Sequence, residues 1–89
     1  MDDDPDKMSD AQNATAHAVS AALAAFGLPY EFAQIVRKTG RGYSGPGEVC
    51  GVAIAADGSP RVIVAHRIDG GTGHLMHIYA PKQIEAWTE

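Results

Sequence analysis

The sequence is poor in cysteine and has no long hydrophobic run. Cys50 is the only cysteine among 89 residues, which excludes an internal disulfide framework and a zinc module built on cysteines. No stretch approaches the roughly 20 strongly apolar residues that a membrane-spanning helix needs. The acidic N-terminus also has no apolar segment of the kind found in signal peptides. We therefore expect a cytoplasmic protein without a membrane partner.

The net charge of -4 is concentrated at the N-terminus. Residues 1–10 contain five aspartates and one lysine, whereas residues 11–89 contain six acidic and six basic side chains. We expect residues 1–8 to form a disordered acidic tail and residues 9–89 to form a single α+β domain. A neutral domain argues against a strongly basic nucleic-acid-binding protein and against an acidic mimic of nucleic acid.

Residues 9–26 have the pattern of one amphipathic helix. Ser9 and Gln12 fit a capping box, while Gly27 and then Pro29 mark the end of the helix. Apolar residues recur between these ends at spacings of three and four, namely Ala16, Val19, Ala22, Leu23 and Phe26. We predict that this alanine-rich helix packs on one face of a sheet.

The remainder of the sequence predicts four strands, at 31–39, 48–56, 61–68 and 74–79. The breaks at 40–47, 57–60 and 69–73 are short and rich in turn residues, which favours antiparallel hairpins. Pro81 suits the start of a short closing helix whose apolar face holds Ile84 and Trp87. The predicted fold class is α+β, with an N-terminal helix packed on a four-stranded antiparallel meander and a short C-terminal helix (α-β-β-β-β-α).

The predicted strand register follows from keeping apolar residues together. A three-residue turn pairs Val52 with Val64 and Cys50 with His66, and a five-residue loop pairs His66 with Met76. One face then holds the predicted core, namely Val52, Ile54, Val62, Val64, Ile68, Met76 and Ile78. The other face holds Arg61, Ile63, Ala65, Arg67, Leu75, His77 and Tyr79. This second face is too apolar to contact water alone, which indicates a surface for a partner.

Two features of the sequence are candidate chemical sites. Residues 40–45 satisfy G-x-G-x-x-G, but a predicted strand follows instead of a helix, so we interpret them as a hairpin loop. The predicted register places Cys50, His66 and His74 on one face, which leaves open either a site (a Cys–His dyad or a partial metal site) or packed core residues. No pair of carboxylates has a spacing suited to acid–base catalysis. We expect no catalytic residues, metal or cofactor.

We therefore expect a small non-enzymatic protein-binding module that occludes a partner protein, either alone or as a homodimer. The predicted contact residues are Arg41, Tyr43, Ile63, Arg67, Leu75, His77 and Tyr79. In size and character the chain resembles the small inhibitor and accessory proteins of phages and mobile elements, anti-CRISPR proteins among them.

The alternative is an RNA-binding module that uses Arg37, Lys38, Arg41 and Arg67. The helix–strands–helix order resembles that of a double-stranded-RNA-binding domain. However, the segment Pro81-Lys82-Gln83-Ile84 lacks the basic start of that family's second helix.

Overall fold

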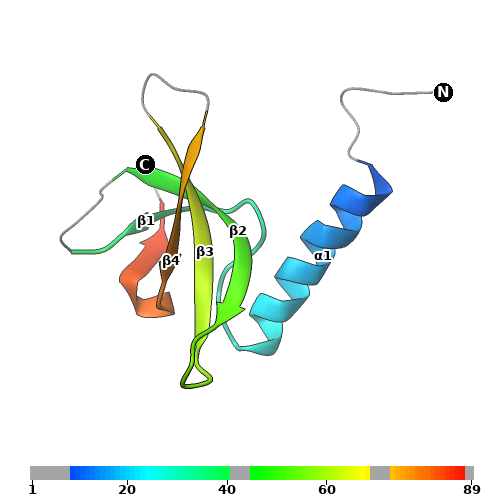
Figure 1. The fold of residues 1–89 in the computed structure, drawn as a ribbon, viewed down its shortest axis with the longest axis horizontal. Coiled ribbons are helices and arrows are strands. Elements are labelled where there is room, and N and C mark those ends of the chain that lie inside the picture. Colours follow the sequence, from blue (N-terminus) through cyan, green and yellow to red (C-terminus); the bar gives the residue numbers. More distant parts are fainter. Residues whose placement is uncertain (1–8, 41–44, 69–72, 88–89) are drawn as a thin grey trace.

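The computed structural model describes residues 9–40, 45–68 and 73–87. In this structure one N-terminal helix stands beside a five-stranded antiparallel sheet (Figure 1). The elements in chain order are helix α1 (Asp10–Ala25), strands β1 (Ile35–Lys38), β2 (Pro46–Ile54), β3 (Pro60–Arg67) and β4 (His74–Tyr79), the 3-10 turn η1 (Pro81–Gln83) and strand β5 (Ile84–Ala86). The predicted α+β class with an antiparallel sheet is confirmed.

Hydrogen bonds between residues close in sequence fix both ends of α1. Ser9 Oγ accepts the backbone N–H of Gln12 at 3.1 Å, and Gln12 Oε1 accepts the N–H of Ser9 at 2.8 Å, which completes the predicted capping box. At the other end Gly27 has a φ of 74°, and the N–H of Leu28 donates to the carbonyl of Leu23 at 3.0 Å. Both predicted ends are confirmed. Among the described residues, no helix has the length and hydrophobicity needed to cross a membrane.

The strands form one sheet in the order β4-β3-β2-β1-β5. Strand β2 contains a bulge at Cys50, because Val49 pairs with Val64 whereas Gly51 pairs with Ile63. A bulge bends a strand and increases its twist, and Figure 1 shows β2 curving along its length. The curved sheet has an inner face toward the core and an outer face on the opposite side.

The pairing of β2 with β3 is shifted from the prediction by two residues after the bulge and by three residues before it. Val52 lies opposite Val62 and not Val64, and Gly47 takes the place opposite His66 that the prediction gave to Cys50. The shift of two residues keeps the side chains after the bulge on their predicted face, whereas the shift of three turns those before it to the other face, so that Val49 points inward. Val62 and Val64 are fully buried, and their predicted inward direction is correct.

The shift between β3 and β4 has a larger effect. His66 lies opposite Leu75 and not opposite Met76 as predicted. A shift of one residue turns every side chain of a strand to the other face. The inward side chains of β4 are Leu75, His77 and Tyr79, and the outward ones are His74, Met76 and Ile78. The predicted face assignment of β4 is therefore wrong.

The C-terminal segment also differs from the predicted short helix. η1 is a single 3-10 turn, and residues 84–86 then pair with β1 as a fifth strand, with Ala86 opposite Val36. Ile84 is only 4% exposed. Burial of this side chain against the sheet favours a strand over a further helical turn.

Strand β1 begins at Ile35 and not at residue 31. Residues 31–34 form a turn in which the N–H of Gln34 donates to the carbonyl of Glu31 at 3.2 Å. Ala33 in this turn has a φ of 69°, a left-handed conformation that interrupts an extended strand.

The core lies on the inner face and consists of Leu23, Val36, Val49, Val62, Val64, Tyr79 and Ile84. Leu23 is the only buried side chain of α1, and the first turns of the helix are exposed. Residues of β1, β3, β4 and β5 belong to the same buried cluster. The helix therefore covers part of the inner face, and the curvature of the sheet closes much of the rest.

Candidate functional site

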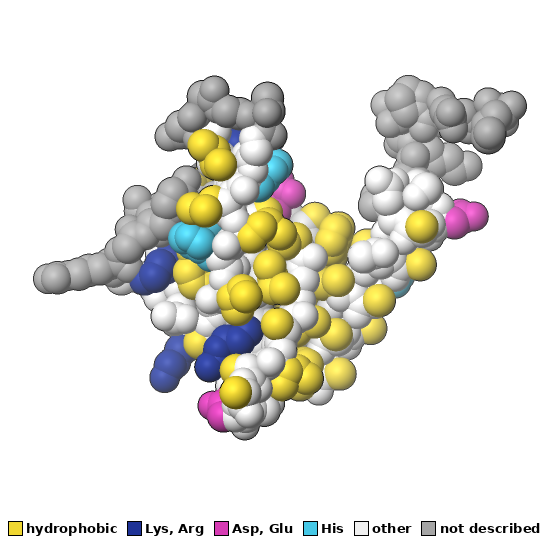
Figure 2. All heavy atoms as spheres, viewed as in Figure 1, with side chains coloured by type: hydrophobic (Ala, Val, Ile, Leu, Met, Phe, Trp, Pro, Cys, Tyr) yellow, Lys and Arg dark blue, Asp and Glu magenta, His cyan; other side chains and the backbone are white. Residues whose placement is uncertain are grey.

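The outer face of the sheet exposes an apolar surface. By register its side chains include Ile35, Arg37, Pro46, Glu48, Ala53, Arg61, Ile63, Ala65, Arg67, His74, Met76 and Ile78. Met76 is 56% exposed and Ile78 is 62% exposed. Hydrophobic side chains reach the surface over the strands as well as along α1 (Figure 2). Apolar side chains clustered in this way are typical of surfaces that bind another protein.

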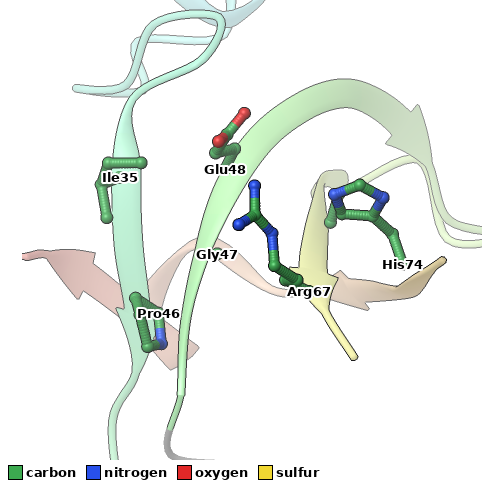
Figure 3. A pocket seen from close by; sticks show the side chains of 7 residues that line it. Ile35, Pro46, Gly47, Glu48, Arg67 and His74 are labelled. Carbon is green, nitrogen blue, oxygen red and sulfur yellow. The ribbon is translucent and has the colours of Figure 1, made fainter. Parts of the chain in front are cut away.

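A hollow of about 260 Å³ lies on the outer face where β1, β2, β3 and β4 run side by side (Figure 3). It is lined by Ile35, Pro46, Gly47, Glu48, Ala65, Arg67 and His74. Glu48, Arg67 and His74 supply polar groups, and the other residues supply an apolar floor. Pockets for small molecules usually have about 300–1,000 Å³. The hollow is slightly smaller than this range.

The described basic residues of the RNA-binding alternative lie on both faces of the sheet. Arg37 Nη2 lies 2.6 Å from Glu85 Oε2, and the Arg37 guanidinium lies 5.4 Å from the centroid of the Trp87 ring. Arg67 shares the outer face with Arg37, whereas Lys38 lies on the opposite face of β1. The described residues of the RNA-binding alternative are thus divided between two faces, and one of them is already paired with a carboxylate.

Three polar side chains on the inner face form a chain of hydrogen bonds. His66 is fully buried and Tyr79 is 5% exposed. Tyr79 Oη lies 2.9 Å from His66 Nε2 and 2.6 Å from His77 Nδ1. On its other side, His66 Nδ1 lies 3.2 Å from the carbonyl oxygen of Pro46.

The direction of these hydrogen bonds follows from their chemistry. The carbonyl of Pro46 can only accept, so His66 Nδ1 carries a hydrogen. Burial lowers the pKa of His66 and the nearby His77 lowers it further, although its backbone hydrogen bond to Pro46 opposes this change. The ring is therefore neutral near pH 7, and its Nε2 accepts the Tyr79 hydroxyl. The Tyr79 oxygen in turn accepts the N–H of His77 Nδ1.

A glycine makes room for this network. A Cβ atom at Gly47 would lie 2.9 Å from His66 Nδ1 and 2.5 Å from Val64 Cγ1. Within the described part of the chain, every buried side-chain nitrogen and oxygen has a hydrogen-bond partner. The His66 ring at one end of the His66–Tyr79–His77 network is fully buried, so a substrate cannot reach it.

The predicted contact residues are distributed over both faces. Ile63 and Arg67 lie on the outer face as expected, whereas Leu75, His77 and Tyr79 point to the inner face. Arg41 and Tyr43 lie outside the described residues. Met76 and Ile78, which the prediction placed in the core, are the exposed apolar residues of β4. Sequence reasoning missed these two residues because it chose the wrong register.

Cys50, His66 and His74, the residues of the candidate thiol–histidine site, do not lie together. His66 lies on the inner face and His74 on the outer face. The thiol of Cys50 lies at the bulge, 3.5 Å from the carbonyl oxygen of Ile63, and burial together with the charge of Glu48 raises the pKa of this thiol. In the ranges that the structure describes, no three His, Cys, Asp or Glu residues are grouped so that they could hold a metal ion.

No protein-family model matches the chain, and no curated protein or solved structure shows significant similarity to it.

Proposed function

We propose that this protein is a non-enzymatic protein-binding module whose outer face occludes a partner protein. The observation that carries this proposal is the exposure of Met76 and Ile78 beside a hollow with polar walls. Protein interfaces commonly combine an apolar centre with a polar rim, and methionine and arginine are enriched in them. Here Ile63, Met76 and Ile78 form the apolar area and Arg67 lies at its border.

The hollow gives the proposed interface a specific contact point. A side chain of the partner that enters it meets the apolar surface of Ile35, Pro46 and Ala65 and can form hydrogen bonds with the polar wall. Side chains that fill a pocket at the centre of an interface usually contribute most of its binding energy. Blocking the hollow should therefore weaken binding more than a similar change elsewhere.

The test is affinity capture of partners with the full chain, compared between two variants. Ala65→Arg puts a long side chain into the hollow from β3, and Ala56→Arg makes the same change in the exposed turn between β2 and β3. We expect the wild type and Ala56→Arg to recover one protein in near-equimolar amounts, and Ala65→Arg to recover about tenfold less or lower still.

Equal recovery by both variants would show that the outer face is not the contact surface. Recovery of nucleic acid alone, with binding that weakens steeply as salt is added, would instead support the RNA-binding alternative.

A further inference from the structure

We propose that β4 is a dimerisation edge, at which β4 of one copy pairs antiparallel with β4 of a second copy about a two-fold axis. Strands β4 and β5 are the two edges of the sheet, since the order is β4-β3-β2-β1-β5. The backbone N–H and C=O groups along the unpaired edge of such a strand can form hydrogen bonds with another extended chain. This dimer does not depend on the proposed occlusion of a partner protein.

The two edges differ in the features that normally prevent such pairing. β5 has three residues, and its Glu85 carboxylate is held in an ion pair with Arg37. β4 has six residues and is paired with β3 without a bulge from His74 to Tyr79. It contains no proline, lysine, arginine, aspartate or glutamate, which are the residues that usually protect an edge. Within residues 9–40, 45–68 and 73–87, β4 is therefore the sheet edge better suited to pairing with a second strand.

The sequence of β4 is suited to pairing with itself. Self-pairing about a two-fold axis brings each charged residue close to its own copy or to a neighbour, and β4 has no acidic or basic residue other than histidine. An axis through His77 places Met76 of one copy opposite Ile78 of the other on the outer face. Both side chains are more than half exposed in the single chain, at 56% and 62%. Because directly opposite side chains on paired strands contact each other, Met76 of one copy and Ile78 of the other would shield each other from solvent.

The inner side of the same pairing is also apolar. With the axis through His77, Leu75 of one copy lies opposite Tyr79 of the other, and Leu75 is 43% exposed in the single chain. Six-residue strands paired in this way form about six backbone hydrogen bonds. The two sheets then join into one, and their outer faces become continuous.

Charge-reversal variants test both the edge and the register. In the variant Met76→Lys/Ile78→Lys and in the variant Met76→Glu/Ile78→Glu, like charges face each other across the axis. We expect the wild type to sediment at twice its 9.4 kDa at micromolar concentration, and each double variant to dissociate at concentrations at least about tenfold higher than the wild type does. An equimolar mixture of the two variants should recover the dimer, because Lys then faces Glu. Ile54→Lys, at a position on β2 that is 65% exposed, serves as the matched control and should leave the dimer intact.

Three results would overturn the dimer. The first is a wild type that stays monomeric up to millimolar concentration. The second is a dimer that the β4 variants do not weaken or that Ile54→Lys disrupts. The third is a mixture of Lys and Glu variants that remains monomeric although each variant is folded by circular dichroism. Since Ala65→Arg changes β3 and not β4, it should keep the dimer while it loses captured partner, so the two proposals can fail separately.

Discussion

Replacing Tyr79 with phenylalanine would remove one oxygen atom from the centre of the His66–Tyr79–His77 network. The side chain is 5% exposed, so the ring would remain in the core and the packing would change little. His66 Nε2, which lies 2.9 Å from the hydroxyl, would lose this hydrogen-bond donor in a buried position. The N–H of His77 Nδ1 would also lose its acceptor at 2.6 Å.

The expected loss of unfolding free energy is about 2 kcal/mol, because leaving a buried polar group unpaired usually costs about 1–3 kcal/mol. In a domain of this size, 1 kcal/mol corresponds to a shift in Tm of about 4–8 °C. Tyr79→Phe should therefore lower the Tm by roughly 10 °C. Urea unfolding followed by circular dichroism measures the change directly.

A double-mutant cycle separates the network from simple packing. His66→Leu removes the imidazole, and on its own it should also destabilise the protein by about 2 kcal/mol, since it leaves the Tyr79 hydroxyl with one partner fewer. The variant His66→Leu/Tyr79→Phe has neither group and should lose clearly less than the sum of the two single changes. We expect a coupling energy of about 1–2 kcal/mol.

Tyr30→Phe is the matched control for this cycle. The Tyr30 hydroxyl donates to the carbonyl of Ile84 at 2.9 Å, a hydrogen bond outside the His66–Tyr79–His77 network. Its removal should cost about 1 kcal/mol and should add to the effect of His66→Leu. A cost below about 0.5 kcal/mol for Tyr79→Phe, or additive effects of Tyr79→Phe and His66→Leu, would show that the network does not stabilise the fold in this way.

Three further predictions concern stability. Because burial lowers the pKa of His66 below its ordinary value of 6.5, the unfolded chain takes up this proton at a higher pH than the folded protein does. The free energy of unfolding should therefore decrease as the pH falls below 6.5. Urea unfolding at several pH values should show a smaller decrease for His66→Leu than for the wild type. Gly47→Ala should destabilise by about 1–3 kcal/mol because its Cβ would lie 3.0 Å from the carbonyl oxygen of Ala65. Gly51→Ala should change thermal unfolding little, because its Cβ would meet only the side chain of Ile63, with the flexible Cδ1 nearest at 3.2 Å. Ala33→Gly should stabilise by about 0.5 kcal/mol in the same assay, since it relieves a φ of 69°, and an unchanged or lower Tm would contradict this.

The parts of the fold that depend on neighbouring residues could be predicted from the sequence. The ends of α1 depend on Ser9, Gln12 and Gly27, whose hydrogen bonds and backbone angle are local. The C-terminal segment could not be predicted in the same way. Pro81 correctly indicated a helical start, but the pairing of residues 84–86 with β1, nearly fifty residues earlier in the chain, ended the helix after one turn.

The outer face could not be predicted because β4 fits either register by hydrophobicity alone. Each of its two faces offers two large side chains and one histidine: Leu75, His77 and Tyr79 on one, and His74, Met76 and Ile78 on the other. The loop before β4 does not settle the register from sequence, because its glycines allow turns of several lengths. A bulge such as the one at Cys50 adds a further residue that hydrophobic pairing does not reveal.

The hydrogen bonds of the inner face resolve this choice between registers. If β4 slipped by one residue, Met76 and Ile78 would turn to the inner face while Leu75 and Tyr79 turned to the outer face, so each face would still carry two large side chains of β4. His66 would remain buried, however, and its Nε2 would lose the Tyr79 hydroxyl. An unpaired buried nitrogen costs about 1–3 kcal/mol, which is sufficient to favour one of two otherwise similar registers by a factor of ten or so. The buried network therefore determines which apolar side chains of β4 the protein presents on its outer face.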